Sequence, residues 1–345
     1  MATAAPTRES VRRLLDLIVA ARGKRIVVLG DLIADEFVSG RISRVSREAP
    51  VLILEYDKTE IVPGGAGNAA SNVATLGGAV TLVALAGRDE PGRRVLASFP
   101  SRVDRRAITR PAGYHTPVKT RILAGGVHSA KQQVVRIDRF TRDGLTEAWR
   151  AQWMRQAAKS LRQADAVLVS DYGSGLISPA VVTELVAPLR TRRRAVPVLI
   201  DSRYELLRYC GLTACTPNES EVEHALGVTI GDAPRVLERA GRAILARTRM
   251  DAVLVTRGSR GMALFERATP TTHIPIYGSD EIADVTGAGD TVMATLTLAL
   301  AAGASMADAA RLANYAGGLV VMKRGTATVS ARELARAVTL DPGGR

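Results

Sequence analysis

The stretch Asp284-Val285-Thr286-Gly287-Ala288-Gly289-Asp290-Thr291 decides how this chain folds and what it does. Gly287, Ala288 and Gly289 offer backbone N–H groups that no large side chain obstructs. The Ala- and Leu-rich run to Leu300 that follows is typical of a buried helix. The first N–H groups of a helix are unpaired and its dipole is positive there, so this turn predicts an anion site. A carboxylate beside it, Asp290, predicts a base that takes up a proton while a phosphoryl group is bound.

The composition favours an intracellular α/β protein. The 345 residues are 46% hydrophobic, which is enough for a large core in one domain. Two cysteines, Cys210 and Cys215, exclude a disulfide framework, and neither they nor the four histidines have metal-ligand spacing. We find no secretory signal and no apolar run long enough to span a bilayer. We therefore expect a cytoplasmic protein with no membrane contact.

The net charge of +13 raises the question of nucleic-acid binding. Nearly all the positive charge is Arg, and it is scattered along the chain except at Arg192-Arg193-Arg194. Aromatic residues are only 4% of the chain, which leaves few platforms on which bases can stack. We expect no nucleic-acid partner, and we expect some of the arginines to bind phosphorylated ligands.

Strands and helices alternate along most of the sequence. Arg25–Leu29 predicts a first strand, Ala66–Leu76 a helix, and from about Thr146 helices alternate with short apolar runs such as Ala166–Val169 and Pro197–Ile200. Such alternation predicts a mostly parallel sheet covered by helices on both faces. Two β-rich segments, about 35–62 and 116–138, do not fit it. We expect them to pair into a small lid over the carboxyl ends of the main strands.

The turn Pro63-Gly64-Gly65-Ala66-Gly67-Asn68 comes just before a predicted helix. It lacks the third glycine of a dinucleotide fingerprint. One interpretation is close approach to a polyol, with N–H groups from Gly64 and Gly65 and the amide of Asn68 reaching hydroxyls. The other is a structural glycine turn that caps the helix. Asp31, at a predicted strand end, is equally consistent with a ligand to sugar hydroxyls and with an ordinary surface or capping residue.

Two further segments suggest a nucleotide site, each with an alternative. Asn218 and Glu221 lie on one face of a helical turn, where they can hold Mg²⁺ through water near a triphosphate. The same spacing is that of a capping box. The turn Thr256-Arg257-Gly258-Ser259-Arg260-Gly261 can pass under a nucleotide, or can simply be a tight β-turn.

Taken together, these motifs resemble the ribokinase-like (PfkB) carbohydrate kinases over nearly the whole chain. The resemblance rests on Gly30-Asp31, the turn at 64–68, and the D-x-T-G-A-G-D signature from Asp284 to Asp290. It implies the ribokinase-like three-layer α/β sandwich, a single kinase domain over 1–345, and ATP and Mg²⁺ as cofactors.

The resemblance also implies residue roles. Asp290 is the general base, with Gly287, Ala288 and Gly289 as the anion hole. The sugar is bound by Asp31, Gly64, Gly65 and Asn68, and the Mg²⁺–phosphate region contains Asn218 and Glu221. The nucleotide is lined by Thr256, Gly258, Gly261 and Asn314. Asp284 and Thr286 match positions that bind a monovalent cation such as K⁺ in some members.

Within the family, the chain is most similar to kinases of D-glycero-D-manno-heptose 7-phosphate in ADP-heptose synthesis. This rests on Ser43–Pro50, Ser170-Asp171-Tyr172, Thr216-Pro217-Asn218 and Gly325–Ser330. The bifunctional relatives continue into a nucleotidyltransferase domain that this sequence lacks, so we expect a stand-alone kinase. A 7-phosphate needs cations away from ATP, and the candidates in or near the lid are Arg44, Arg47, Lys119, Arg121, Lys131 and Arg136.

Two departures leave the sugar open. Ser174 and Arg203 stand where the heptose kinases have lysines, and Arg203 only partly substitutes for one. Ribose, fructose and fructose 6-phosphate therefore remain alternative substrates, and a non-catalytic sugar- or nucleic-acid-binding protein remains a further alternative. The lid strands would leave open edges in a monomer, so we expect a homodimer formed through the lid.

Overall fold

The larger of the two sheets forms the centre of the molecule. The computed structural model describes residues 7–126, 131–140, 144–278, 284–323 and 325–341, and within them nine strands lie in the order β13-β12-β11-β10-β9-β8-β1-β4-β5. The strands from β11 to β5 pair in parallel, and β12 and β13 are antiparallel. Their bounds are β1 (Arg25–Gly30), β4 (Ala79–Val83), β5 (Val103–Asp104), β8 (Ala166–Asp171), β9 (Val198–Ser202), β10 (Ala214–Cys215), β11 (Ala252–Thr256), β12 (Met262–Glu266) and β13 (Thr272–Ile274).

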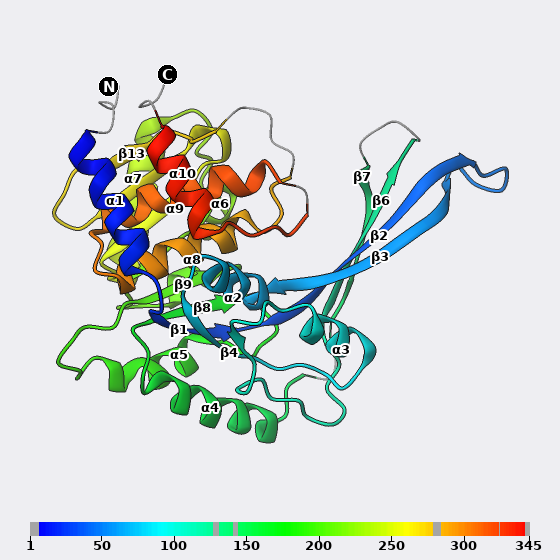
Figure 1. The fold of residues 1–345 in the computed structure, drawn as a ribbon, viewed down its shortest axis with the longest axis horizontal. Coiled ribbons are helices and arrows are strands. Elements are labelled where there is room, and N and C mark those ends of the chain that lie inside the picture. The colour runs from blue at the N-terminus through cyan, green and yellow to red at the C-terminus, as the bar shows by residue number, and fades with distance from the viewer. Residues whose placement is uncertain (1–6, 127–130, 141–143, 279–283, 324, 342–345) are drawn as a thin grey trace.

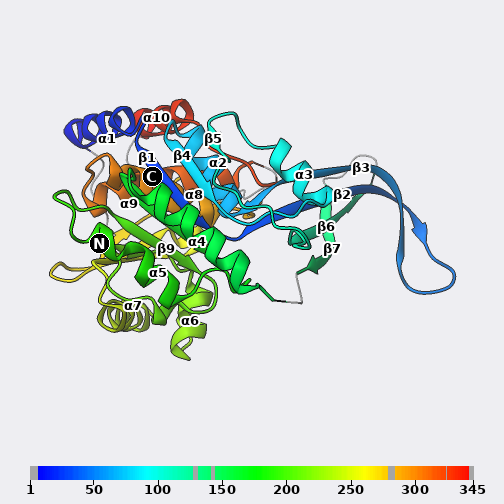
Figure 2. The ribbon, with the colours of Figure 1, turned by 90° about the horizontal axis from the view of Figure 1, so that it is seen from below.

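Helices cover both faces of this sheet, because its strands are apolar on both sides. In β1, Ile26 and Val28 belong to one core cluster, whereas Val27 and Leu29 belong to the other. The first face is covered by α1 (Arg8–Ala20), α2 (Ala66–Thr75), α8 (Ala288–Ala301), α9 (Met306–Val321) and α10 (Ala331–Leu340). The second is covered by α4 (Glu147–Leu161), α5 (Pro179–Val186), α6 (Glu219–Leu226) and α7 (Pro234–Thr248). Figures 1 and 2 show this arrangement, which confirms the predicted three-layer α/β fold.

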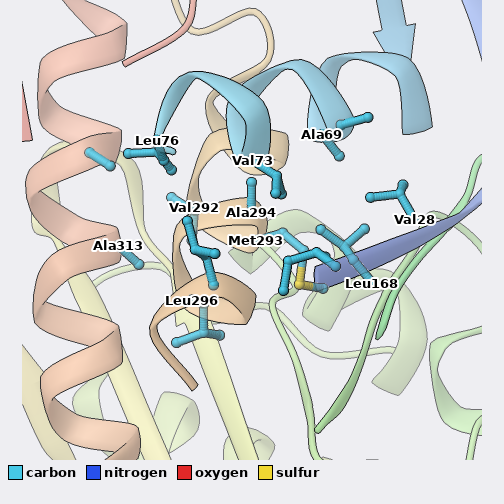
Figure 3. Packing of buried hydrophobic residues seen from close by; sticks show 14 of the residues in the cluster. Val28, Ala69, Val73, Leu76, Leu168, Val292, Met293, Ala294, Leu296 and Ala313 are labelled. Carbon is cyan, nitrogen blue, oxygen red and sulfur yellow. The ribbon is translucent and has the colours of Figure 1, made fainter. Parts of the chain in front are cut away.

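Helices α2 and α8 pack against each other over the sheet. Ala69 and Val73 of α2, Val292 and Ala294 of α8, and Val28 of β1 belong to one buried cluster (Figure 3). All five of these side chains are almost completely buried. Small residues on both helices let the two backbones approach closely, and so the N-terminal turns of α2 and α8 come together at one edge of the sheet.

A second sheet forms the lid, as predicted. Its strands lie in the order β3-β2-β6-β7, and it projects from the body of the molecule (Figure 1). The bounds are β2 (Leu32–Val45), β3 (Leu52–Gly65), β6 (Val118–Gly125) and β7 (Gln132–Arg139), and α3 (Glu90–Ala97) lies beside β3. Residues 127–130, inside the second predicted lid segment, lie outside the described residues.

The register of the lid gives it two different faces. Asp35 pairs with Lys119, and Arg121 pairs with Arg136, so these charged side chains share one face. The opposite face presents apolar residues: Val135 and Ile137 are each 48% exposed. The charged face turns toward the main sheet, because its residues line the cavity described below.

Candidate active site

A cavity of about 550 Å³ lies between the lid and the main sheet. The main sheet contributes residues at or just beyond the carboxyl ends of its strands, such as Tyr172 after β8, Asp201 in β9 and Thr256 in β11. The lid contributes Asp35 and Lys119 from the charged face. Ligands of open parallel sheets bind at these strand ends, so the cavity is in the expected place for a binding site.

Asp290 lies in the first turn of α8 and lines this cavity. The hydroxyl of Tyr172 donates to its Oδ1 atom across 3.1 Å, and the Nδ2 amide of Asn68 donates to its Oδ2 atom across 2.8 Å. Burial raises the pKa of Asp290 to about 6, although both hydrogen bonds oppose the rise. A carboxylate with a pKa near neutrality is suited to accept a proton from a hydroxyl group.

The turn before Asp290 has the geometry of an anion site. Gly287 is the N-cap of α8 with φ of 77°, and a Cβ atom there would lie 2.5 Å from Nδ2 of Asn68. The N–H of Ala288 donates to the Val285 carbonyl, so this predicted member of the anion hole is engaged. For the N–H of Gly289 we find no acceptor within the described part of the chain. The predicted residues Gly287, Ala288 and Gly289 all line the cavity.

The residues predicted to bind the sugar separate into two groups. Gly65 lines the cavity, whereas Gly64, Asn68 and Asp31 lie behind its wall. Asn68 instead holds Asp290. Asp31 is 3% exposed and accepts hydrogen bonds from the backbone N–H of Tyr172 (2.9 Å) and of Ser174 (3.3 Å) and from the Ser174 hydroxyl. In this structure Asp31 therefore supports the loop after β8 and does not face the cavity.

Four cationic side chains are among the described residues that line the cavity, three from the lid and one from the loop after β9. They are Lys119, Arg121, Arg136 and Arg203. Arg121 donates to Asp35 across 2.7 Å, and the guanidinium of Arg203 lies 3.4 Å from Glu221. The Lys119 ammonium lies 4.7 Å from the centroid of the Tyr172 ring.

Three other predicted cations lie elsewhere in or near the lid. Lys131 pairs with Asp57 and is absent from the cavity wall, and Arg44 and Arg47 are exposed, at the end of β2 and just after it. The structure therefore brings Arg203 to the site, together with Lys119, Arg121 and Arg136, and does not bring Arg44, Arg47 or Lys131 there.

The main-sheet side of the cavity contains every residue predicted to contact the nucleotide. Asn218, Glu221, Thr256, Gly258, Gly261 and Asn314 all line it. Asn218 and Glu221 form the capping box of α6, with N–H to oxygen distances of 2.9 and 3.0 Å. A β-bridge joins Asn218 to Thr256, so the two motifs lie side by side. Asn218 and Glu221 therefore do cap α6. Because they also line the cavity, the prediction that they contact the nucleotide still stands.

An apolar wall adjoins these polar groups. Met262, Ile276, Val292 and Val321 line it, and the Nδ2 amide of Asn314 donates to the Pro275 carbonyl across 2.8 Å. A flat heterocycle with polar edges fits a slot of this kind.

Carboxylates gather between the two ends of the cavity. Burial raises the pKa of Asp201 well above its ordinary value, and the charges of Glu221 and Asp290 raise it further. Burial also raises the pKa of Glu221. A cation between such groups relieves their repulsion, and oxygen ligands of this kind suit Mg²⁺. Two carboxylates are fewer ligands than a closed metal site provides, so they fit a magnesium ion that takes its remaining ligands from water and phosphate.

The predicted monovalent-cation residues are arranged differently. Thr286 lines the cavity, but Asp284 does not. The carboxylate of Asp284 accepts from the N–H of Thr286 (2.8 Å) and of Gly325 (3.0 Å), which fixes the turn before α8. Among the described residues, no group of three or more His, Cys, Asp or Glu side chains is arranged to hold a metal ion.

The family model of the pfkB carbohydrate kinases matches residues 24–333. The chain belongs to this family. It is therefore a carbohydrate kinase, as the signature from Asp284 to Asp290 predicted.

Curated relatives of this pfkB kinase are longer than the chain itself. It is 40% identical over 319 residues to the bifunctional protein HldE of Trichlorobacter lovleyi, covering 92% of this chain and 63% of that protein. It is 39% identical to the bifunctional protein HldE of Geobacter metallireducens, covering 92% of this chain and 64% of that protein. The sequence thus spans a little under two thirds of these relatives.

Solved structures support the fold of the kinase. The Arabidopsis thaliana ribokinase complexed with ribose and ATP superposes with a TM-score of 0.69 at 20% identity, covering 92% of this chain and 99% of that one. Phosphofructokinase-2 of Escherichia coli in complex with fructose-6-phosphate gives a TM-score of 0.72 at 17% identity, with coverage of 92% and 99%. In the described part of the kinase, no helix is both long and apolar enough to cross a membrane.

Several cavity residues had no assigned role at the sequence level. Tyr172 is only part of a motif in the sequence, Asp35 is only the first residue of a predicted lid segment, and no motif predicts the wall of Met262, Ile276, Val292 and Val321. Asp201 could have been found, because it lies at the carboxyl end of a parallel strand. No spacing rule connects Tyr172 to Asp290, since only the folded chain brings them together.

Proposed function

We propose that this kinase transfers the γ-phosphoryl group of ATP to the anomeric hydroxyl of D-glycero-D-manno-heptose 7-phosphate. The observation that carries the proposal is the placing of Asp290 and four cationic side chains, Lys119, Arg121, Arg136 and Arg203, in one cavity. A sugar that already bears a phosphate needs such cations opposite the nucleotide, whereas a neutral sugar does not. The motif resemblance to heptose 7-phosphate kinases and the relatives named HldE support the same substrate.

In the proposed reaction, Asp290 accepts the proton of the sugar hydroxyl. The hydroxyl oxygen forms a bond to the γ-phosphorus while the bond from that phosphorus to the β–γ bridging oxygen breaks, and ADP leaves with the bridging oxygen. The N–H of Gly289 and the positive end of the α8 dipole stabilise the charge on the transferring group. General-base catalysis contributes about 10²- to 10⁴-fold, and alignment of the two substrates supplies much of the rest.

The two substrates would occupy opposite ends of the cavity. ATP would lie along the apolar wall with Asn314, and its phosphates would reach the turn at Thr256 and Gly258. Asp201 and Glu221 would hold Mg²⁺, which neutralises phosphate charge when bound. Asp284 and Thr286 would bind a monovalent cation such as K⁺ close to the anion site.

A substrate panel tests the proposal. ADP release would be followed with heptose 7-phosphate, ribose, fructose and fructose 6-phosphate, at fixed ATP and Mg²⁺. We expect the highest kcat/KM with heptose 7-phosphate and low values with both uncharged sugars. A clear preference for ribose or fructose would reject the phosphorylated acceptor, and a preference for fructose 6-phosphate would keep the cations but reject the heptose. No ADP release with any sugar would favour a non-catalytic binding protein.

We also propose that two copies associate through the apolar face of the lid. Large apolar side chains are exposed there or at the lid's ends: Ile42, Val45, Val51, Leu52, Tyr56, Val134, Val135, Ile137 and Phe140. The edge strands β3 and β7 add unpaired backbone groups, which a second lid can satisfy. Sedimentation at micromolar concentration would show a dimer that Ile137→Asp converts to a monomer. A wild-type monomer would contradict this assembly.

A further inference from the structure

Tyr172 connects Asp290, the proposed base, to the buried carboxylate of Asp31, which has no part in the proposed reaction. Its hydroxyl donates to Oδ1 of Asp290, and its backbone N–H donates to Oδ2 of Asp31. Asn68, which holds the other oxygen of Asp290, is not among the residues that line the cavity, whereas Tyr172 is. Of the two side chains that hydrogen-bond to Asp290, Tyr172 is therefore the one that a ligand in the cavity can reach.

The loop that carries Tyr172 is fixed from several directions. The N–H and the hydroxyl of Ser174 donate to Asp31, and the N–H of Gly173 donates to Oδ1 of Asp171 across 3.0 Å. The ring of Tyr172 lies 4.7 Å from the Lys119 ammonium and 6.0 Å from the Arg203 guanidinium. Two substrate-facing cations thus contact the ring whose hydroxyl contacts the base.

The position of this hydroxyl has a chemical consequence. A sugar hydroxyl that gives its proton to Asp290 must approach the carboxylate from the cavity and hydrogen-bond to it first. Tyr172 already provides an O–H donor on that side, with a proton that its high pKa makes hard to remove, since burial and the charge of Asp290 raise the pKa of this phenol. A water molecule must also displace the Tyr172 hydroxyl from Asp290. Unlike a sugar phosphate, water has no phosphate group that would bind Lys119 and Arg203 in place of the ring.

We propose that Tyr172 is a positioning residue whose hydroxyl occupies the acceptor's place on Asp290 until a sugar phosphate displaces it, and that this occupation limits transfer of phosphate to water. The inference rests on the proposed role of Asp290 as the base. Asp31 then acts indirectly, because it holds the loop that presents Tyr172, and Ser174 closes that loop onto Asp31.

The test compares Tyr172→Phe with the wild type. The substitution removes the hydroxyl and keeps the ring between Lys119 and Arg203. We expect ADP release in the absence of sugar to rise about tenfold, the size of effect that the loss of one hydrogen bond to a charged group allows. We also expect the acid limb of the kcat/KM profile with sugar to move to higher pH, because the lost hydrogen bond favoured the ionised carboxylate.

Tyr315→Phe is the matched control, because it also removes a hydrogen bond from a tyrosine hydroxyl to an aspartate. The hydroxyl of Tyr315 donates to Asp341 across 2.5 Å, and neither residue lines the cavity. Tyr315→Phe should leave both readouts unchanged. Ser174→Ala loosens the loop without altering Tyr172, and should give a smaller rise in sugar-independent ADP release; it also provides a second route if Tyr172→Phe does not fold.

The Asp290→Asn variant distinguishes a failure of the proposed base from a failure of the proposed role of Tyr172. If it loses turnover while Tyr172→Phe and Ser174→Ala leave sugar-independent ADP release and the acid limb unchanged, the base stands and the role of Tyr172 is overturned. If Asp290→Asn keeps nearly normal turnover, the proposed base fails and the role of Tyr172 fails with it. Loss of sugar-dependent turnover in Tyr172→Phe with no rise in sugar-independent release would also overturn the inference.

Discussion

The Nδ2 amide of Asn68 donates a 2.8 Å hydrogen bond to Oδ2 of Asp290, and so joins the first turn of α2 to the first turn of α8. The orientation of the Asn68 amide is set from behind, because its Oδ1 atom accepts from Nδ2 of Asn72 across 3.1 Å. Asn72 in turn accepts from the hydroxyl of Thr291, next to the base (3.0 Å). This buried network links the glycine turn at 64–68 to the signature at 284–290, because the amide of the first holds the carboxylate that we propose as the base.

Removing this amide should alter the base directly. In Asn68→Ala, the pKa of Asp290 should rise above its present value of about 6, because a hydrogen bond that favours the carboxylate is lost. We expect kcat to fall about tenfold at pH 6 and less at pH 8. A pH profile of kcat measures this. Ser71→Ala on the same helix removes a hydroxyl that bonds only to the Gly67 carbonyl, and should leave the profile unchanged. Equal losses at both pH values would show that Asn68 does not act through the pKa.

Replacing the base itself should separate chemistry from binding. Asp290→Asn keeps an oxygen to accept from Asn68 and an amide to donate to the Tyr172 hydroxyl, so the local geometry can persist. We expect turnover at least roughly a hundredfold slower, with the dissociation constants of ATP and sugar phosphate little changed. Calorimetry and single-turnover kinetics give the two quantities. A variant that turns over at nearly the normal rate would rule out Asp290 as the base.

The sequence predicted those parts of the site that depend on local chain geometry. A glycine turn before an apolar helix and an Asn–Glu pair at a helix start each define their own backbone, and both Gly287 and Asn218 line the cavity, while the roles predicted for them stay predictions. The direction of a side chain at a strand end depends on what packs over it. Asp31 therefore faces the 172–174 loop, a fact that no spacing reveals.

The lid cations show the same limit. Lys119 and Lys131 both belong to the second lid segment, but the strand register places Lys119 beside Asp35 at the cavity and leaves Lys131 paired with Asp57. Position in or near the lid segments identified the group of candidate cations, and only the sheet register shows which of them reach the cavity.

The raised pKa of Asp290 should also appear in the stability of the protein. Its folded-state pKa of about 6 exceeds the ordinary 3.8, so the folded state holds the proton more tightly. The stabilisation that protonated Asp290 gives to the folded state is complete below about pH 4, and it is lost as the pH rises through about 6. An asparagine side chain cannot ionise, so the Asp290→Asn variant avoids this loss. We expect its free energy of unfolding above pH 6 to exceed that of the wild type by up to about 3 kcal/mol. Urea unfolding at pH 4, 6 and 8 measures the difference.

Asp308 provides the matched control of opposite sign. Although burial opposes it, the hydrogen bonds from Arg13 and Ser305 hold the pKa of Asp308 below its ordinary value. That carboxylate stabilises the fold above its unfolded pKa, so Asp308→Asn should be less stable than the wild type at pH 8. If Asp290→Asn is also less stable than the wild type at pH 8, the buried charge of Asp290 does not destabilise the folded protein.

The cation most suited to a test of the acceptor's phosphate is Lys119. Its ammonium lies over the ring of Tyr172, and burial lowers its pKa, a cost that a nearby phosphate dianion would offset. Arg121 is a poorer choice, because its removal would strand the buried carboxylate of Asp35. We expect Lys119→Ala to raise the KM for the sugar phosphate about 10- to 100-fold, the range for loss of a charge-assisted hydrogen bond, with the KM for ATP little changed.

The control for Lys119 is another lysine of the lid that lies away from the cavity. Lys58 of β3 is exposed and pairs with Glu60 across 2.8 Å, so Lys58→Ala should leave both KM values unchanged. The decisive comparison is between acceptors. If Lys119→Ala weakens an unphosphorylated sugar as much as its phosphate ester, Lys119 binds the sugar ring or holds Tyr172. If only the phosphate ester is weakened, the charged face of the lid recognises the second phosphate, because loss of a cation then costs affinity only where the ligand carries a compensating charge.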